Sequence, residues 1–215
     1  MMALRCPRTR LTKDTRGLAL LEFALALPVL VVLIMGGAEI ANYTITRQRV
    51  SQLALQIADN ASRIGDQSVL RNRPISERQI NDLFTGANLQ AGSLDLARQG
   101  RVFLSGLTVN AQNGQWLQWQ RCYGALGATS HYGVQGDGAS GTSFPGMGPP
   151  SAKVLATASG PVVFAEVAVT YKPVISSKWV PSGAIIEIAA LAVRDDRDTS
   201  GSGIQNNEHA AVSSC

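Results

Sequence analysis

The stretch from Arg16 to Ala38 decides the fold of this chain, and it reads RGLALLEFALALPVLVVLIMGGA. From Leu18 to Ala38 the only ionisable residue is Glu22. A helix of about 21 residues, rising about 1.5 Å per residue, spans roughly 30 Å, the hydrocarbon thickness of a bilayer. The apolar cores of secretory signal peptides are shorter, and no Ala-x-Ala site before a polar stretch is evident. We therefore predict that residues 18–38 form a transmembrane helix that stays in the mature protein.

Glu22 lies inside this apolar run, where a carboxylate is unexpected. A charged side chain at membrane depth costs about 2.5–3.5 kcal/mol on insertion scales, and such side chains usually serve a function. The alternative is a carboxylate near the interface that reaches water or takes up a proton. The combination of a basic leader, Gly17 five positions earlier and Phe23 directly afterwards favours a functional carboxylate.

The excess positive charge of the chain lies before the apolar run. The whole chain has a formal charge of +4 and a pI of about 9.2. The leader, residues 1–17, alone carries a net +4, and the rest of the chain has 14 basic and 14 acidic residues. A neutral body removes the main support for a nucleic-acid-binding function. By the positive-inside rule, we expect residues 1–17 in the cytoplasm and the chain after about residue 40 outside.

The helical pattern continues beyond the predicted membrane span, over residues 39–65. Apolar residues recur at spacings of three, four or seven with polar residues between them, which is typical of an amphipathic helix. Gly65 is a suitable helix stop. A single helix from Leu18 to Ile64 would be roughly 70 Å long, and its apolar face needs partners, namely the protein's own C-terminal domain and neighbouring copies. The apolar positions are Ile40, Tyr43, Val50, Leu53, Ile57, Ala61 and Ile64.

Residues 66–194 have the pattern of a domain with helix and sheet. Ser76, followed by Glu77, begins a short predicted helix. Four segments have strand-like composition, and Asn113-Gly114 between the first two is a hairpin signal. Short or glycine-rich connections predict one antiparallel sheet, with Gly106 as a bulge or break. The fold class is therefore α+β, a long N-terminal helix followed by an antiparallel β-sheet domain. The predicted strands are 101–110, 115–121, 162–171 and 184–193.

Residues 124–150 are rich in Gly, Ser and Pro and are predicted to form a long loop, and residues 195–215 form a polar tail. The three cysteines, Cys6, Cys122 and Cys215, make no CxxC pair and no metal pattern with the two histidines. If the domain is exported, Cys122 and Cys215 can oxidise to a disulfide that stabilises it by about 2–4 kcal/mol and ties the tail down. The alternative is two unpaired thiols and a mobile tail.

The common catalytic and cofactor motifs are missing from the sequence, including the P-loop, the Rossmann fingerprint, HExxH and GxSxG. His131 could act as a general base, but a histidine in a surface loop is the simpler interpretation. Three carboxylates near the C-terminus could hold a hard cation, but they lack the glycine and the closing glutamate of an EF-hand, which favours a solvated turn. They are Asp195, Asp196 and Asp198. We expect no enzyme activity, no metal and no cofactor.

Aromatic residues are concentrated in the second predicted strand and just after it, at Trp116, Trp119 and Tyr123. One interpretation is a platform for a sugar or a protein partner. The other is that one Trp packs in the core while the other stays half exposed, which is the more ordinary arrangement. A platform of this kind, or the glycine-rich loop 124–150, would suit a single-pass, membrane-anchored exported binding module that is neither cleaved nor assembled with other copies.

The N-terminal residues resemble the TadE-like minor pilins, or pseudopilins, of tight-adherence (Flp) pilus systems. The resemblance covers about residues 16–62, a fifth of the chain. It is carried by Arg16-Gly17, Glu22-Phe23-Ala24-Leu25, Leu27-Pro28-Val29-Leu30 and Gly37-Ala38-Glu39-Ile40, and more weakly by Arg47-Gln48-Arg49-Val50 and Ala58-Asp59-Asn60-Ala61.

This resemblance implies a specific route of assembly. A membrane aspartyl prepilin peptidase would cut between Gly17 and Leu18 on the cytoplasmic side, where glycine leaves the backbone accessible to the protease. Glu22 would then face the α-amine of Leu18 on a neighbouring subunit. Buried between helices, this pair would compensate two charges that are each costly to bury alone. It would therefore favour a subunit that enters at the axial position where the two groups meet.

The resemblance also implies a pilin-like fold and a structural rather than catalytic function in assembling a pilus or secretion apparatus. The expected location is the bacterial inner membrane, crossed once, with the C-terminal domain periplasmic or extracellular. The expected partners are the inner membrane, the prepilin peptidase, other pilin or pseudopilin subunits and the assembly platform. The length exceeds that of a bare major Flp pilin, which favours a minor subunit.

Overall fold

The computed structural model describes residues 17–65, 74–158, 160–181, 183–193 and 197–215. A long N-terminal apolar helix precedes a four-stranded antiparallel sheet, which confirms the predicted α+β class. The leader before Gly17, with Cys6, lies outside the described residues. The elements are α1 (Leu18–Arg63), α2 (Glu77–Ala91), η1 (Gly92–Leu94), α3 (Leu96–Gln99), β1 (Gly100–Val109), β2 (Gln115–Tyr123), β3 (Val162–Thr170), η2 (Ser177–Trp179) and β4 (Ala184–Ala192).

α1 is one continuous helix that includes both the predicted membrane span and its amphipathic continuation, and it passes through Pro28. Ile40, one of the predicted apolar positions, is 55% exposed in the single chain. Glu39, one residue earlier, is fully buried instead. Further along the helix the buried positions recur at the expected three- and four-residue spacing. They are Val50, Leu53, Ala54, Ile57, Ala58 and Ala61.

α2 begins at a capping box, which explains why this short helix starts where it does. The Ser76 hydroxyl accepts a hydrogen bond from the backbone N–H of Gln79 at 3.2 Å. In return, the side-chain oxygen of Gln79 accepts one from the Ser76 N–H at 3.0 Å. Two N–H groups that the helix itself leaves without acceptors are thereby satisfied, and such a cap typically contributes about 1 kcal/mol.

β1 and β2 form the predicted hairpin, with Asn113-Gly114 in its turn. Asn113 adopts a φ of 61°, a left-handed conformation that asparagine tolerates better than most residues. The strand register shifts between Gly106 and Leu107, which confirms the predicted irregularity at Gly106. A β-carbon at Gly106 would lie 2.1 Å from Nε1 of Trp119, so glycine is required for the indole to lie across the strand.

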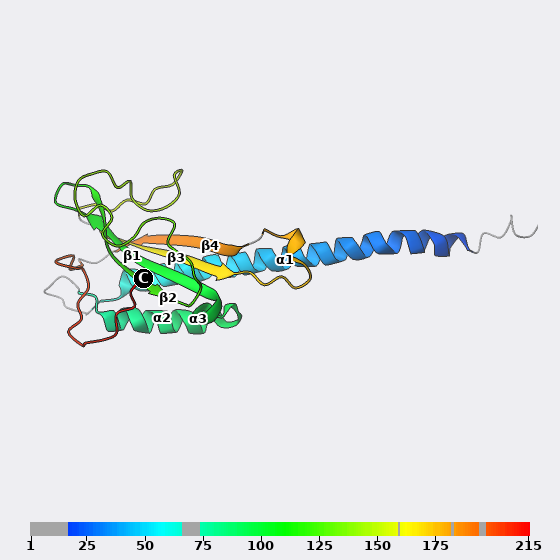
Figure 1. Cartoon of the computed structure of the whole chain (residues 1–215), viewed down its shortest axis with the longest axis horizontal. Helices are drawn as coiled ribbons and strands as arrows, with labels where there is room; N and C mark the ends of the chain where they lie inside the picture. Colours follow the sequence, from blue (N-terminus) through cyan, green and yellow to red (C-terminus); the bar gives the residue numbers. More distant parts are fainter. Residues whose placement is uncertain (1–16, 66–73, 159, 182, 194–196) are drawn as a thin grey trace, which may run out of the picture. The chain divides into compact units, whose positions relative to one another are not determined.

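The strands lie in the order β2-β1-β3-β4, and all neighbours are antiparallel (Figure 1). All but the last residue of β3 are buried, because both faces of the sheet are covered. The connection between β2 and β3 packs on the face that carries Phe164 and forms a core with it. The residues that this connection contributes are Tyr132, Phe144, Met147, Val154 and Ala156.

Helices cover the opposite face. Arg47 of α1 contacts Glu187 of β4 at 2.6 Å, and Glu77 of α2 contacts Arg121 of β2. The strand register places Glu187 and Arg121 on the same face of the sheet. The outer part of α1 and the start of α2 are therefore both joined to this face by ion pairs.

The C-terminal residues run back along the sheet. Cys215 forms a disulfide with Cys122 of β2, with 5.0 Å between their Cα atoms. The carbonyl of Ser213 also accepts a hydrogen bond from the Cys122 N–H at 2.8 Å. Arg197 donates to the carbonyls of Ala61, Ser62 and Ile64, which lie at or just after the C-terminal end of α1, where the carbonyls need donors from outside the helix. The described part of the polar tail is therefore held at both of its ends.

The chain divides into two compact units. The helical unit contains the residues up to Tyr43 together with Pro173–Pro181, which includes η2. The sheet unit contains Thr44–Lys172 and Ser182–Cys215.

Candidate functional site

The start of α1 holds the residues that the sequence nominates for processing and assembly. The helix begins at Leu18, and its first hydrogen bond runs from the Leu21 N–H to the carbonyl of Gly17 at 3.1 Å. A β-carbon at Gly17 would meet no atom within 4 Å, so the described residues leave room for a side chain at this position. Leu18 and Glu22 are four residues apart and therefore lie on the same face of the helix.

Glu22 lies on an exposed, apolar helix surface. The most apolar 18-residue window of α1 has a mean hydropathy of 2.7 and is 0% buried, so α1 is long and apolar enough to cross a membrane. Within the described residues, no side chain forms an ion pair with Glu22. If this surface is covered by lipid or by another helix, Glu22 needs a partner from another chain or must lose its charge.

At the far end of the apolar run, Glu39 organises a loop of the helical unit. Its carboxylate accepts backbone hydrogen bonds from Val174 at 3.3 Å, Ile175 at 2.6 Å and Ser176 at 3.3 Å. A β-carbon at Gly36 would lie 3.5 Å from the Trp179 ring, so the indole is in van der Waals contact with this turn of the helix. Sequence reasoning missed this site, because the only local signal was a carboxylate directly after an apolar run.

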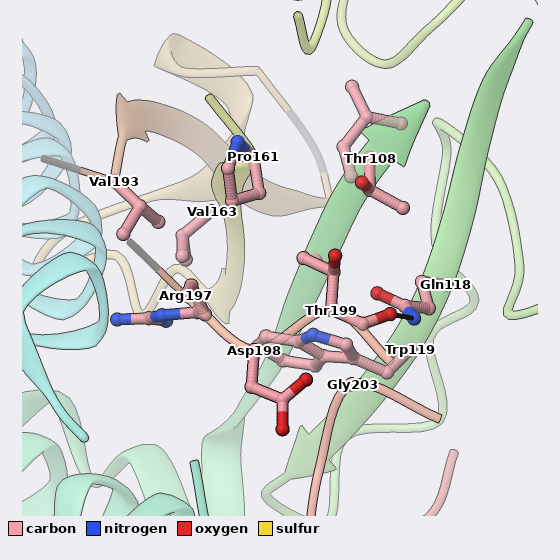
Figure 2. Close-up of a pocket in the computed structure, with 12 residues that line it drawn as sticks. Thr108, Gln118, Trp119, Pro161, Val163, Val193, Arg197, Asp198, Thr199 and Gly203 are labelled. Carbon is pink, nitrogen blue, oxygen red and sulfur yellow. Dashed lines mark hydrogen bonds between the residues drawn. The ribbon is translucent and has the colours of Figure 1, made fainter. Parts of the chain in front are cut away.

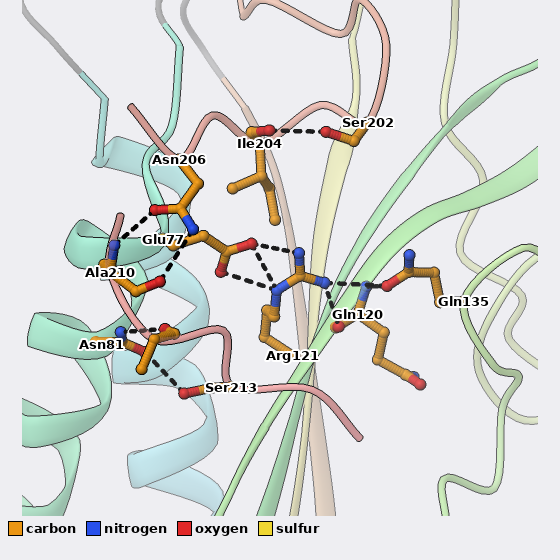
Figure 3. Close-up of polar contacts among 11 residues, drawn as sticks. Glu77, Asn81, Gln120, Arg121, Gln135, Ser202, Ile204, Asn206, Ala210 and Ser213 are labelled. Atoms are coloured by element: carbon orange, nitrogen blue, oxygen red, sulfur yellow. Dashed lines mark hydrogen bonds and ion pairs between the residues drawn. The ribbon is translucent and has the colours of Figure 1, made fainter. Parts of the chain in front are cut away.

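A buried ion pair links α2 to the sheet (Figure 3). The Glu77 carboxylate accepts two hydrogen bonds from Nε of Arg121, at 3.0 and 2.9 Å, and another from Nη2. Nη1 of Arg121 donates to the Gln120 carbonyl at 2.8 Å and to Oε1 of Gln135 at 3.0 Å. The two charged side chains are only 4% and 10% exposed. This arrangement is structural, because it satisfies both charges with protein partners.

His131 does not have the arrangement of a general base beside a nucleophile. Its ring is 52% exposed, and Nδ1 lies 2.6 Å from Oε1 of Glu166, a buried carboxylate on β3. Glu166 also accepts hydrogen bonds from the His131 N–H and from the hydroxyl of Ser130. Ser130 thus donates to the carboxylate and not to the imidazole, so the histidine does not activate it. The three groups hold the loop against the sheet.

The aromatic residues do not form a platform on the surface. Trp119 is only 4% exposed, and Trp116 is half-buried. Figure 2 shows the Trp119 indole among Asp198, Thr199 and Gly203, where it lines a small pocket. Tyr123 stacks on Phe84 of α2 with the ring centres 5.6 Å apart. The interpretation with one Trp packed and the other partly exposed is the one the structure supports.

Of the three carboxylates considered for a cation, only Asp198 is described, and Asp195 and Asp196 lie outside the described residues. The Asp198 carboxylate accepts a hydrogen bond from the Ser200 N–H at 2.9 Å. Hydrogen bonds from Ser200, first from its hydroxyl and then from its backbone, lower the pKa of the Asp198 carboxyl below its ordinary value. In the described part of the chain, no three His, Cys, Asp or Glu side chains gather as metal ligands would.

Comparison with protein families gives a match in the N-terminal part of the chain. A family model described as TadE-like protein matches residues 17–59, which confirms the resemblance over roughly a fifth of the chain. The matched region contains Gly17, Leu18, Glu22 and Glu39. Comparison with curated proteins and with solved structures gives no match. The sheet unit after residue 59 is therefore interpreted from its own geometry.

Proposed function

We propose that this TadE-like chain is a minor pilin or pseudopilin, a structural subunit used in assembling a tight-adherence pilus or secretion apparatus. The observation that carries the proposal is Glu22. This carboxylate lies on an exposed apolar helix, within the matched region, without an ion-pair partner in the described chain. It is also on the same helix face as Leu18, which processing would convert into a new N-terminus.

The chemistry of the proposed contact follows from charge compensation. Cleavage after Gly17 leaves an α-amine on Leu18, which is positively charged near neutral pH. A carboxylate and an ammonium that leave water separately each cost several kcal/mol, and pairing between subunits offsets this cost. A subunit that enters with Glu22 beside a neighbour's Leu18 amine is favoured over one shifted along the helix axis. The contact therefore supplies the register of assembly.

The proposed location follows from the same residues. The helix crosses the inner membrane once, with the basic leader in the cytoplasm and the sheet unit outside. The partners are the prepilin peptidase, neighbouring pilin or pseudopilin subunits and the assembly platform. An anchored binding module that uses Trp116 and Trp119 as a platform has less support, because Trp119 is buried in the sheet unit.

Processing between Gly17 and Leu18 distinguishes this proposal from an anchor that keeps its leader. In a host with a prepilin peptidase, sequencing of the membrane-extracted protein is expected to find Leu18 at the N-terminus. Gly17→Val should block processing, because a branched side chain obstructs the extended backbone that the protease must bind. Gly37→Val is the matched control, because a β-carbon there also meets no atom within 4 Å. An intact leader in this host would contradict the expected processing.

A further inference from the structure

The loop Pro173–Pro181, which belongs to the helical unit, carries exposed apolar side chains beside the end of the apolar helix surface. Val174 is 73% exposed and Trp179 is 37% exposed. Lys178 is also exposed, next to Trp179. Tryptophan beside lysine, together with exposed aliphatic groups, is the composition favoured where a bilayer meets water.

The level of this loop along α1 is set by its contacts with the helix. Trp179 lies against Gly36, and the loop N–H groups bind Glu39 about one turn further on. The apolar run ends at residue 38. If residues 18–38 span the hydrocarbon, the indole lies at its boundary and the Glu39 carboxylate lies just beyond it, among the lipid headgroups.

Glu39 removes the main obstacle to placing a loop at this depth. Irregular backbone is costly near hydrocarbon, because its N–H groups find no water to bind. Three successive N–H groups of this loop, from Val174 to Ser176, donate to the one carboxylate. Glu39 itself is fully buried by these contacts. The loop can therefore turn Val174 and Trp179 toward lipid without exposing these N–H groups to it.

We propose that loop 173–181 is a lipid-contacting anchor, inserted at the bilayer interface in the leaflet that surrounds the C-terminal end of the apolar run. The occupant of its exposed apolar surface is lipid, because Trp179 lies against Gly36, near the end of the helix segment whose length matches the bilayer. Lys178 adds attraction to anionic headgroups. The inference rests on the membrane insertion of α1 in the proposed function. The loop would give the helical unit a second contact with the membrane, which fixes its rotation about the membrane normal.

The test measures how close Trp179 lies to lipid in the full-length protein. The protein is reconstituted in vesicles of phosphatidylcholine and phosphatidylglycerol, with bromine on the acyl chains either near the headgroup or near the bilayer centre. Bromine near the headgroup is expected to lower the tryptophan emission of the wild type by up to about a third, since Trp179 is one of three tryptophans. The Trp179→Phe variant should lose this quenching. In the wild type, bromine at the bilayer centre should quench Trp179 less than bromine near the headgroup.

Two further variants separate lipid contact from a folding defect. Trp179→Phe combined with Val174→Trp places the reporter at a more exposed apolar position of the loop, and it should restore the shallow quenching. Glu39→Gln weakens the acceptor of three backbone N–H groups and should reduce quenching of Trp179. Glu187→Gln, which removes a carboxylate from the sheet unit, is the matched control and should leave the quenching unchanged.

Each alternative occupant has its own signature. If Trp179 faces water, aqueous acrylamide quenches it and brominated lipid does not. If a second copy covers the loop, Trp179 is shielded from both quenchers, and the shielding weakens as the ratio of lipid to protein rises. Either result overturns the proposal. Resistance of the protein to carbonate extraction is measured on the same vesicles, because loss of insertion contradicts the proposed function, whereas retained insertion without shallow quenching contradicts only the lipid-contacting loop.

Discussion

Replacing Arg121 by Met is expected to lower the free energy of unfolding by about 3–5 kcal/mol. The substitution leaves the Glu77 carboxylate buried beside the sheet without the guanidinium that donates to both of its oxygens. Uncompensated burial of a charge costs far more than a typical side-chain deletion at the surface. Because natural domains have a stability of about 5–15 kcal/mol, this change removes a large share of the total.

The position of Glu77 increases the expected effect. It lies in the first turn of α2, and its own N–H donates to the Gln205 carbonyl at 3.0 Å. Arg121 in turn orders Gln135, whose side-chain oxygen it binds together with the Gln120 N–H. The pair therefore connects the helix, the strand, the loop after β2 and the C-terminal segment. We therefore expect the substitution to destabilise all four segments and not only the surroundings of Arg121.

The measurement is urea unfolding of the full-length protein in detergent, followed by the fluorescence of the buried Trp119. Arg63→Met is the matched control, because Arg63 pairs with Asp59 on the surface at 2.9 Å, with the two side chains 69% and 43% exposed. That surface pair should contribute less than about 1 kcal/mol. Adding Glu77→Gln to Arg121→Met should recover part of the stability. Equal effects of the two Arg→Met variants would show that the buried pair is not needed for stability.

Replacing Glu22 by Ala is expected to prevent incorporation into the filament while leaving membrane insertion intact or improved. Insertion improves because a charge leaves the hydrocarbon, which lowers the cost by about 2.5–3.5 kcal/mol on insertion scales. Under the proposed function, incorporation fails because a neighbour's Leu18 amine would lose its counter-charge at a buried contact. A penalty of about 3 kcal/mol corresponds to roughly a hundredfold lower occupancy in the assembled state.

The comparison is made in cells whose own copy has been removed, by the amount of protein in sheared filaments relative to the membrane fraction. Leu20→Ala is the matched control, because it trims an exposed side chain two residues away on the same apolar helix. The control should change the ratio little, since no charge is involved. If both variants assemble as the wild type does, Glu22 has no assembly function.

The helix and the sheet were predictable because their signals are local. An uninterrupted apolar run, a hairpin dipeptide at Asn113-Gly114 and the serine cap of α2 each act within a few residues. Gly106 was also predictable as an irregularity, although its reason, the indole of Trp119 across the strand, depends on the partner strand. Hydrophobic periodicity and turn residues therefore predicted α1, α2 and the four strands along the chain, but not the short helices η1, α3 and η2.

The polar contacts were not predictable, because each joins segments that are far apart in the sequence. Glu39 binds N–H groups 135 to 137 residues later, and Glu77 binds Arg121 across 44 residues. Nothing in the local pattern distinguishes these glutamates from solvated ones. Ile40 illustrates the same limit, because periodicity places it on the apolar face of the helix, whereas the returning loop contacts Glu39. A buried carboxylate is identified only when its partner is known.

The most direct test of the central claim converts the proposed contact into a covalent bond. A membrane-permeant carbodiimide joins a carboxylate to an amine with no spacer, so it links only groups already in contact. Filaments assembled from a mixture of isotopically light and heavy subunits should yield a peptide in which the Leu18 amine of one subunit is joined to Glu22 of another. The mixed light–heavy species distinguishes this link from one within a single helix. Filaments that contain this chain but give only same-chain links, or none, would contradict the account.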